Sequence, residues 1–385
     1  MRELGVHTWI LAVSSFCGLA ALVFLDSGAA LDLLGRIVPV LGFVAAMSVV
    51  VNAAQSVQTF EGLIGLLQRR LGLSSGRGAG SPARAWALIL GISLVVTVFF
   101  SLDTTALLIT PLVIAIARAS GLNTLAAAFA VVWMANLGSM LLPISNLTNL
   151  LAVETEHFSG LADYVSLSWL PALVLAVIAA LAPLVPARGR FPLTGAHPTP
   201  LTSESRRFAG LIGVLLVLLL TPLPVWMPTT GAALIAVLHL RHLGFPTPVH
   251  RMIPWSTLFF AFSLSAAAAV VHSLGLLDPV LAALADRGPF TLAFAGALLS
   301  NASNNIPAYL ALEPAATTSS GLMALLIGVN AGPIITPWAS LATLLWADQS
   351  RRHGVEIRWS TFMFAGLVIA PVAVVVSTAG LLLVN

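Results

Sequence analysis

Charged residues are scarce in this chain, and lysine is missing altogether. Only 8% of the 385 residues are charged, while 58% are hydrophobic. A soluble globular protein carries about 25% charged residues because its surface must face water. The composition therefore excludes a water-soluble fold and indicates a protein whose solvent is the lipid bilayer.

Cysteine is almost as scarce. Cys17 is the only one, which excludes a disulfide framework and a multi-thiolate metal site. The phosphate-binding motif G-x-x-x-x-G-K-[ST] and the zinc-protease motif H-E-x-x-H are also missing. The net charge of +3 comes from arginines, which membrane topology explains, so no nucleic-acid partner is expected. We expect neither a cofactor nor a resident metal, and no enzyme, because no nucleophile–base pattern is present.

Long apolar segments fill most of the chain. A membrane-spanning helix needs about 20 such residues. Residues 8–25 have no small-residue cleavage site after them and are interpreted as a retained first helix. We predict an all-α polytopic membrane protein of about nine spans, at 8–25, 37–67, 121–152, 165–186, 208–226, 229–243, 252–276, 321–347 and 360–383.

Two further apolar segments, 84–118 and 289–318, are interrupted by polar residues. Ser101–Thr105 interrupts the first, and Ser300–Asn305, with Pro307 just beyond, interrupts the second. Both segments are too long for one span and short for two spans with a loop. Each is expected to form a re-entrant helical hairpin that turns at mid-membrane. A full double crossing is the alternative.

The arginines predict the orientation in the membrane. With a cytoplasmic N-terminus, the arginine-bearing loops 68–84, 187–207, 239–251 and 351–358 lie inside, and only Arg36 and Arg287 lie outside. This asymmetry agrees with the positive-inside rule. We expect a multi-pass protein of the cell inner (plasma) membrane.

The two halves of the chain resemble each other. Residues 136–151 align with residues 330–345, so that Asn, Gly and Pro coincide, Asn146 matches Ser340 and Asn149 matches Thr343. With hairpins that open to opposite sides, this is the pattern of inverted-topology repeats in secondary transporters; chance similarity of apolar segments is the alternative. The predicted domains are an N-terminal repeat (1–186, broken helix 121–156), a cytoplasmic linker (187–207) and a C-terminal repeat (208–385, broken helix 321–350).

Polar side chains gather at four places within this apolar sequence. Pro143 and Pro337 break two helices, and such breaks persist in hydrocarbon only where they line a cavity or ligand site. Hydroxyl and amide side chains beside half-helix N-termini suit ligand binding; helix–helix glue is the alternative. The expected substrate-binding residues are Thr104, Thr105, Ser145, Asn146, Thr148, Asn149, Ser303, Asn304, Asn305, Thr336, Ser340 and Thr343.

Asp103 is the one acidic residue within these clusters. A carboxylate at mid-membrane is costly and marks a functional site, and a carboxyl group removed from water keeps its proton more readily. Asp103 is therefore expected to carry a coupling proton, and capping of the following half-helix is a compatible structural role. Glu61 continues a polar stripe of Asn52, Gln55 and Gln58. It is either a second proton carrier or an interfacial residue.

These residues resemble the arsenite efflux permease family of the ion transporter superfamily. The matching stretches are 102–111, 139–151, 303–314 and 332–346, and the similarity spans roughly residues 37–383. The resemblance implies export of arsenite or antimonite as the uncharged trihydroxide, in exchange for protons. It also implies that Asp103 is the acidic tip of the first hairpin and that Asn304 and Asn305 form the amide tip of the second. The first half has one span fewer before its hairpin than the second.

We therefore expect a secondary active transporter that works by alternating access. Its expected partners are the lipid bilayer, protons and arsenite or antimonite. A soluble ATPase subunit, known in some relatives, stays open, as does a sodium/proton antiporter or organic-anion carrier of the same superfamily. Clustered thiolates would trap soft trivalent arsenic, so hydroxyls and amides suit a site that must release it.

Overall fold

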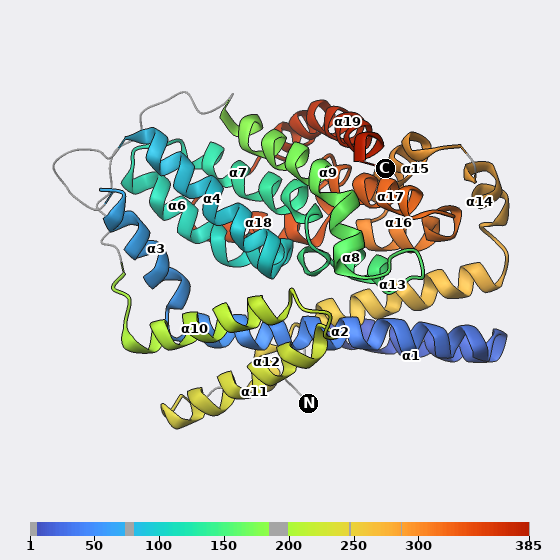
Figure 1. Cartoon of the computed structure of the whole chain (residues 1–385), viewed down its shortest axis with the longest axis horizontal. Coiled ribbons are helices and arrows are strands. Elements are labelled where there is room, and N and C mark those ends of the chain that lie inside the picture. Colours follow the sequence, from blue (N-terminus) through green and yellow to red (C-terminus); the bar gives the residue numbers. More distant parts are fainter. Residues whose placement is uncertain (1–5, 74–80, 185–198, 246–247, 286, 385) are drawn as a thin grey trace. The chain divides into compact units, whose positions relative to one another are not determined.

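The computed structural model describes residues 6–73, 81–184, 199–245, 248–285 and 287–384 (Figure 1). Within these ranges every regular element is a helix, so the all-helical fold predicted from the sequence is confirmed. Most of the predicted linker 187–207 lies outside the described residues. Its last residues lead into α10 (Ser203–Leu218), where the Thr202 hydroxyl accepts a hydrogen bond from the Ser205 amide at 3.1 Å.

Seven helices of the described chain are long and apolar enough to cross a membrane. The protein is thus a multi-pass membrane protein. These helices are α1 (Val6–Leu25), α2 (Ser27–Ser56), α4 (Pro82–Phe100), the stretch formed by α5 (Leu102–Thr104), η1 (Thr105–Ile109) and α6 (Thr110–Ala119), α9 (Leu161–Leu181), α13 (Trp255–Ser273) and α19 (Trp359–Val384).

The other helices are shorter. The predicted spans 208–226 and 229–243 correspond to α10 and to α11 (Trp226–His242), which have 16 and 17 residues. At 1.5 Å per residue each is about 25 Å long, less than the roughly 30 Å hydrocarbon core. The remaining helices are α3 (Thr59–Arg70), α7 (Thr124–Leu137), α8 (Leu147–Val153), α12 (Val249–Met252), α14 (Asp278–Leu284), α15 (Pro289–Ala302), α16 (Asn305–Leu312), α17 (Ser319–Ala331) and α18 (Leu341–Arg352).

The predicted span 37–67 has the wrong boundaries. The helix begins at Ser27, where the Asp26 carboxylate accepts a hydrogen bond from the Ala29 amide at 3.0 Å, and it ends at Ser56. Gln58 has a φ of 57°, which no α-helix allows, and α3 starts at Thr59. Glu61 therefore does not continue the helical stripe of Asn52 and Gln55, because a helix end separates them.

The helices form two compact units. Unit 1 contains residues 1–60 and 202–285; in it α1 packs along α13, and α2 packs against α11. Unit 2 contains residues 61–201 and 286–385; in it α15 packs against α17, α9 against α19, and α4 against α7. Each unit draws on both halves of the chain. The compact units thus differ from the predicted repeats, which stay a prediction.

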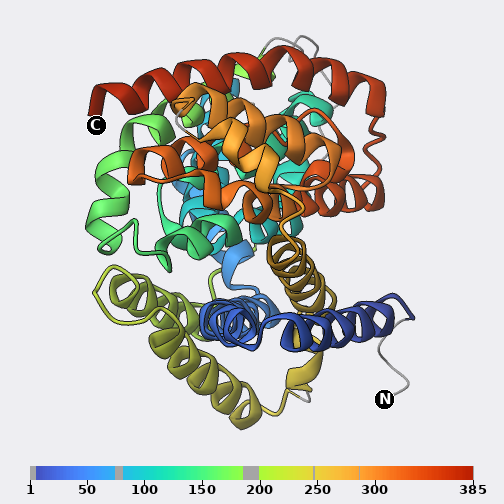
Figure 2. The same ribbon diagram turned by 90° about the vertical axis from the view of Figure 1, so that its right-hand side faces the viewer.

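Two short helices, α7 and α17, form the centre of unit 2. All of their residues from Ala126 to Leu137 and from Ser320 to Ala331 are buried. A helix that is apolar on every side is expected at such a position. Around this centre, Figure 2 shows the red α19 as one uninterrupted helix, although Pro371 lies within it.

Candidate functional site

The first polar interruption separates α4 from α5. Ser101 has φ 119° and ψ 161°, a conformation that is essentially restricted to glycine. Its hydroxyl accepts a hydrogen bond from the Thr104 amide at 3.3 Å, and the Thr105 hydroxyl donates to the Ser101 carbonyl at 3.0 Å. Five residues of π-helix follow, a geometry that is frequent at functional sites. A strained residue and a π-turn at one tip favour a functional role for this segment.

The two arms of this first interruption pack against each other, since α4 contacts α5, η1 and α6. The arms have 19 and 18 residues, and each is long and apolar enough to cross a membrane alone. The length of each arm therefore fits a full double crossing as well as the predicted re-entrant hairpin. In the second interruption the arms α15 and α16 have only 14 and 8 residues, which favours the re-entrant arrangement.

The first broken helix runs from α7 to α8. Between them lie the 3-10 turns η2 (Gly138–Met140) and η3 (Pro143–Ser145). Ser145 donates to the carbonyl of Val98 in α4 at 3.2 Å, which ties the break to the first interruption. Asn146 is the N-cap of α8, and its Oδ1 accepts a hydrogen bond from the Thr148 amide at 3.4 Å.

The second broken helix runs from α17 to α18, with η6 (Pro337–Ala339) between them. Residues of the second interruption hold it in place. The Asn301 Oδ1 accepts a hydrogen bond from the Thr336 amide at 2.9 Å, and the Asn304 Nδ2 donates to the Trp338 carbonyl at 2.9 Å. Asn304 is also the N-cap of α16. Ser303 is exposed, whereas Asn305 is buried.

The four predicted clusters come together inside unit 2. Helix α18 packs against α5, η1 and α6 of the first interruption, and α8 packs against α16 of the second. The Asn136 Nδ2 lies 3.5 Å from the Thr343 Oγ1, and the Asn330 Oδ1 accepts a hydrogen bond from the Asn146 Nδ2 at 2.7 Å. The sequence therefore pointed to one region of the fold rather than to four separate places.

The two acidic residues differ in their surroundings. Asp103 is the second residue of α5 and is half-buried. Its neighbours Thr104 and Thr105 are both engaged in the hydrogen bonds of the tip. Glu61 lies in the first turn of α3, and its Oε2 is buried without a hydrogen-bond partner among the described residues. Residues 199–201 pack on the adjoining Gly62 and Gly65. A role for Glu61 in proton coupling stays a prediction.

Some residues of this region escaped the reasoning from sequence. Asn136 and Asn330 begin the aligned segments of the two halves, so the alignment itself was a signal for them. Asn301 lies within the second interruption, yet its hydrogen bonds to the 3-10 turn before α18 could not be inferred. Ser139, Trp338 and Thr97 are further members of this region. The Thr97 hydroxyl lies 2.9 Å from the Thr105 hydroxyl.

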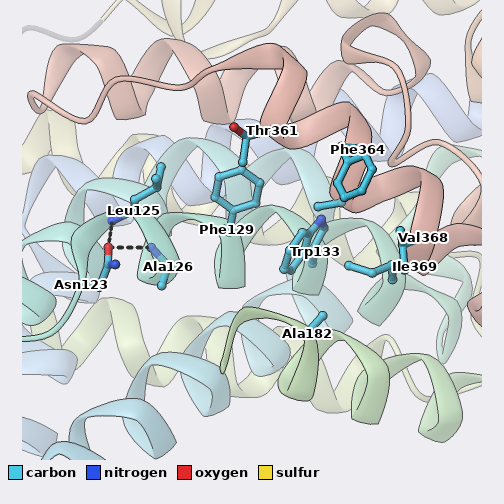
Figure 3. Close-up of a pocket in the computed structure, with 11 residues that line it drawn as sticks. Asn123, Leu125, Ala126, Phe129, Trp133, Ala182, Thr361, Phe364, Val368 and Ile369 are labelled. Carbon is cyan, nitrogen blue, oxygen red and sulfur yellow. Dashed lines mark hydrogen bonds between the residues drawn. The ribbon is translucent and has the colours of Figure 1, made fainter. Parts of the chain in front are cut away.

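A separate apolar pocket of about 370 Å³ lies between α7 and α19 (Figure 3). Its wall includes Phe129 and Trp133 of α7 and Phe364, Val368 and Ile369 of α19. Its only side-chain amide, that of Asn123, already accepts hydrogen bonds from the Leu125 and Ala126 amides at 3.0 and 3.2 Å. The volume of the pocket is sufficient for a small solute. Its mostly apolar side chains suit a hydrocarbon ligand and not a polyhydroxy compound.

The chain matches the family described as citrate transporter (CitMHS) over residues 6–321. It is 30% identical over 341 residues to the arsenical pump membrane protein of Yersinia enterocolitica, which covers 80% of this chain and 79% of that protein. The identity to the arsenical pump membrane protein of Escherichia coli (strain K12) is also 30%, over 342 residues and the same shares.

A likeness to a solved structure concerns the fold alone. The YdaH transporter of Alcanivorax borkumensis, whose crystal structure is described as revealing an unusual topology, superposes with a TM-score of 0.57. The match covers 98% of both chains at 16% sequence identity. The arrangement of helices is thus one that a known membrane transporter also uses.

Proposed function

Since this chain belongs to the citrate transporter (CitMHS) family of the ion transporter superfamily, we propose that the solute it moves across the membrane is the trihydroxide of trivalent arsenic or antimony. The observation that carries this proposal is the 30% identity to arsenical pump membrane proteins over 80% of the chain. The direction proposed is export from the cytoplasm.

The chemistry of the polar region supports an uncharged, hydroxyl-bearing substrate. The proposed lining residues supply hydroxyl and amide groups, which both donate and accept hydrogen bonds. Among the described residues that line it, no side chain is cationic. Cys17, the one thiol of the chain, belongs to α1 in unit 1 and is exposed. Hydrogen bonds instead of thiolate coordination allow the cargo to be released.

Proton coupling is proposed to run through Asp103. Its carboxyl group follows the strained Ser101 and lies beside the π-helical turn that packs against α18. A change in the charge of Asp103 would therefore act on the contact between the first interruption and the second broken helix. Glu61 is the second proposed carrier.

The transport cycle proposed is alternating access between two inverted repeats, with the N-terminus in the cytoplasm. In such a cycle the hairpins and broken helices expose one site in turn to either side. Each half of the chain contributes one broken helix to unit 2. In each half this helix is hydrogen-bonded to the interrupted segment, through Val98 of α4 in the first half and Asn304 in the second. A soluble ATPase subunit would then be an additional source of energy and not a requirement.

Everted membrane vesicles from cells that make this protein provide the test. An imposed proton gradient, acid inside, is expected to drive accumulation of arsenite, and collapse of the gradient is expected to stop it. Accumulation that continues on ATP alone after the collapse would contradict the antiport mechanism and support a pump with an ATPase subunit. No accumulation of arsenite or antimonite, with the protein present in the membrane, would reject the proposed substrate.

The family description favours one second candidate, an organic-anion carrier. Citrate is a multivalent anion, and proteins usually hold such anions with Arg or Lys side chains. The chain has no lysine, and the proposed lining residues include no arginine. Uptake of radiolabelled citrate with a sodium gradient in the same vesicles tests this candidate, and sodium-driven uptake that arsenite does not inhibit would establish it.

A further inference from the structure

Two asparagines that the alignment of the halves pairs with each other make reciprocal contacts in unit 2. Asn330, from the second half, is hydrogen-bonded to Asn146 and Asn149 of the first half. Asn136, from the first half, reaches Thr343 of the second half. Asn146 and Asn149 are the aligned counterparts of Ser340 and Thr343. Each asparagine thus contacts the start of the other half's second helix segment.

The two sides of this arrangement are not equally satisfied. The Asn330 Oδ1 accepts hydrogen bonds from Asn146 and from the Ser139 hydroxyl, and its Nδ2 donates to Asn149 and to the Leu326 carbonyl, all at 2.7–3.0 Å. All four hydrogen-bonding positions of this amide are therefore in use.

On the other side the hydrogen bonding is incomplete. The Asn136 Nδ2 lies 3.5 Å from the Thr343 Oγ1, the limit of a hydrogen bond, and its main bond is to the carbonyl of Val132 in its own helix. The Asn136 Oδ1 and the Ser340 Oγ are buried, and neither has a hydrogen-bond partner among the described residues. On the first side, the corresponding residues Asn330, Asn146 and Asn149 all have partners, and the neighbouring Thr148 Oγ1 has none among the described residues.

The N-termini of α8 and α18 also differ, since only α8 has a side-chain cap. Asn146 caps α8 through its side chain, whereas Ser340, with an extended backbone at φ −142° and ψ 135°, makes no capping hydrogen bond to α18. In the first turn of α18, a helix of 12 residues, the Thr343 N–H donates to the Ser340 carbonyl at 3.2 Å, and the other N–H groups receive no side-chain acceptor from the N-cap. These donors and the unpartnered atoms of Asn136 and Ser340 belong to the same side.

We propose that the substrate binds at the N-terminus of α18, where Asn136, Ser340 and Thr343 supply its hydrogen bonds, and that Asn330 is a positioning residue. This inference rests on the proposed function, and it places the trihydroxide at the α18 end of the polar region. The Asn136 Oδ1 accepts from a substrate hydroxyl, the Ser340 and Thr343 hydroxyls donate or accept, and the α18 N–H groups donate to substrate oxygens. Because those N–H groups carry partial positive charge, the site disfavours a cation.

Burial links this site to access. Asn136, Ser340 and Thr343 are 0–1% exposed, and α18 packs against η1. A substrate can reach these atoms only when elements packed around them, of which η1 is one, move apart. A buried polar group without a partner destabilises the closed arrangement, so the ligand that supplies the missing partners is favoured there.

The test compares Ser340→Ala with Ser15→Ala in everted vesicles and in detergent. The first variant removes a hydroxyl that has no hydrogen-bond partner among the described residues, and the second removes a buried hydroxyl of unit 1 that donates to the Phe259 carbonyl at 3.0 Å. For Ser340→Ala we expect the KM for arsenite to rise about fivefold, the loss of one hydrogen bond, with an unchanged or higher Tm. For Ser15→Ala, which lies outside the proposed lining residues, we expect a lower Tm and an unchanged KM.

Thermal stabilisation by sodium arsenite adds a readout that does not depend on transport. The wild type is expected to gain Tm as arsenite is added, and Ser340→Ala and Thr343→Val are expected to need more arsenite for the same gain. An unchanged KM in Ser340→Ala, an equal rise of KM in Ser15→Ala, or stabilisation by sodium chloride alone would overturn the inference. A wild-type protein that neither transports nor responds to arsenite would reject the proposed function instead.

Discussion

The Nδ2 of Asn330 donates a hydrogen bond of 3.0 Å to the Oδ1 of Asn149, across 181 residues of sequence. Both side chains are buried, and each makes a further bond to a backbone carbonyl, Asn330 to Leu326 and Asn149 to Ser139. The pair therefore joins the centre of the second half to the broken helix of the first half. In a protein interior such a network stabilises only while every member keeps its partner.

Asn330→Ala is expected to be strongly destabilising. The change leaves Asn146, Asn149 and Ser139 each without one buried partner, at about 1–3 kcal/mol for each group left unsatisfied. Asn136→Ala removes one long contact to Thr343 and one bond to the Val132 carbonyl of its own helix, and it should cost less. Thermal unfolding in detergent, followed by tryptophan fluorescence, measures both variants. A larger loss of Tm in Asn136→Ala than in Asn330→Ala would contradict the assignment of Asn330 as the positioning residue.

Asp103→Asn is expected to abolish gradient-driven transport of arsenite, because the amide does not ionise and so cannot bind and release a coupling proton. Its size and shape match those of the carboxyl group, so the amount of protein in the membrane should not change. Vesicle uptake at a fixed proton gradient measures the loss. Asp278→Asn, at an exposed position of α14, is the control and should transport as the wild type does. Full uptake by Asp103→Asn would remove this residue from the coupling mechanism.

Gly366→Ala should prevent close packing of α19. A Cβ at this position would collide with the carbonyl oxygen of Ile334, which is backbone and cannot turn aside. We expect a loss of several kcal/mol of stability, as for other overpacked cores. Gly91→Ala in α4 is the matched control, since nothing lies within 4 Å of its added Cβ. In a helix that exchange should be neutral or gain up to about 1 kcal/mol.

These two glycine variants are compared by Tm in the same detergent. Equal stability of the two proteins would show that α19 does not pack on residues 334–335 as described.

We expect the stability of the fold to depend on pH through the Glu204 carboxylate in unit 1. Its Oε2 lies 2.8 Å from the His239 Nε2, and its Oε1 accepts a hydrogen bond from Arg207 at 2.9 Å. The hydrogen bond with His239, aided by Arg207, holds the pKa of Glu204 below its ordinary value of 4.5. A lowered pKa stabilises the fold above the ordinary value, and this stabilisation is lost as pH falls through the lowered one.

Wild-type Tm should therefore fall more steeply below pH 4.5 than the Tm of Glu204→Gln, in which the group cannot titrate. Glu356→Gln, at an exposed acid in the segment before α19, is the control and should keep the wild-type profile. Parallel profiles of wild type and Glu204→Gln over pH 3–6 would show that the contact with His239 does not form.

The sequence alone determined the class of this protein and the places where its helices break. Apolar run length and charge scarcity are properties of the chain itself, and they indicate a bilayer whatever the tertiary contacts. The breaks near Pro143 and Pro337 could be read for the same reason, because proline removes a backbone donor locally. The start of α2 at Ser27 was not predicted, because small residues and Asp32 make the beginning of this helix less apolar than a typical span. The Asp26 side chain caps the helix.

Only the tertiary structure decided which polar side chains are free. Asn136 and Asn330 occupy equivalent positions in the aligned halves, and no local pattern distinguishes them. Asn330 has all of its hydrogen bonds made, whereas the Asn136 Oδ1 is buried with no partner among the described residues. The partners that distinguish the two asparagines lie about 180 to 210 positions away in the chain. Hydrogen-bond satisfaction depends on these long-range neighbours, and packing alone brings them together.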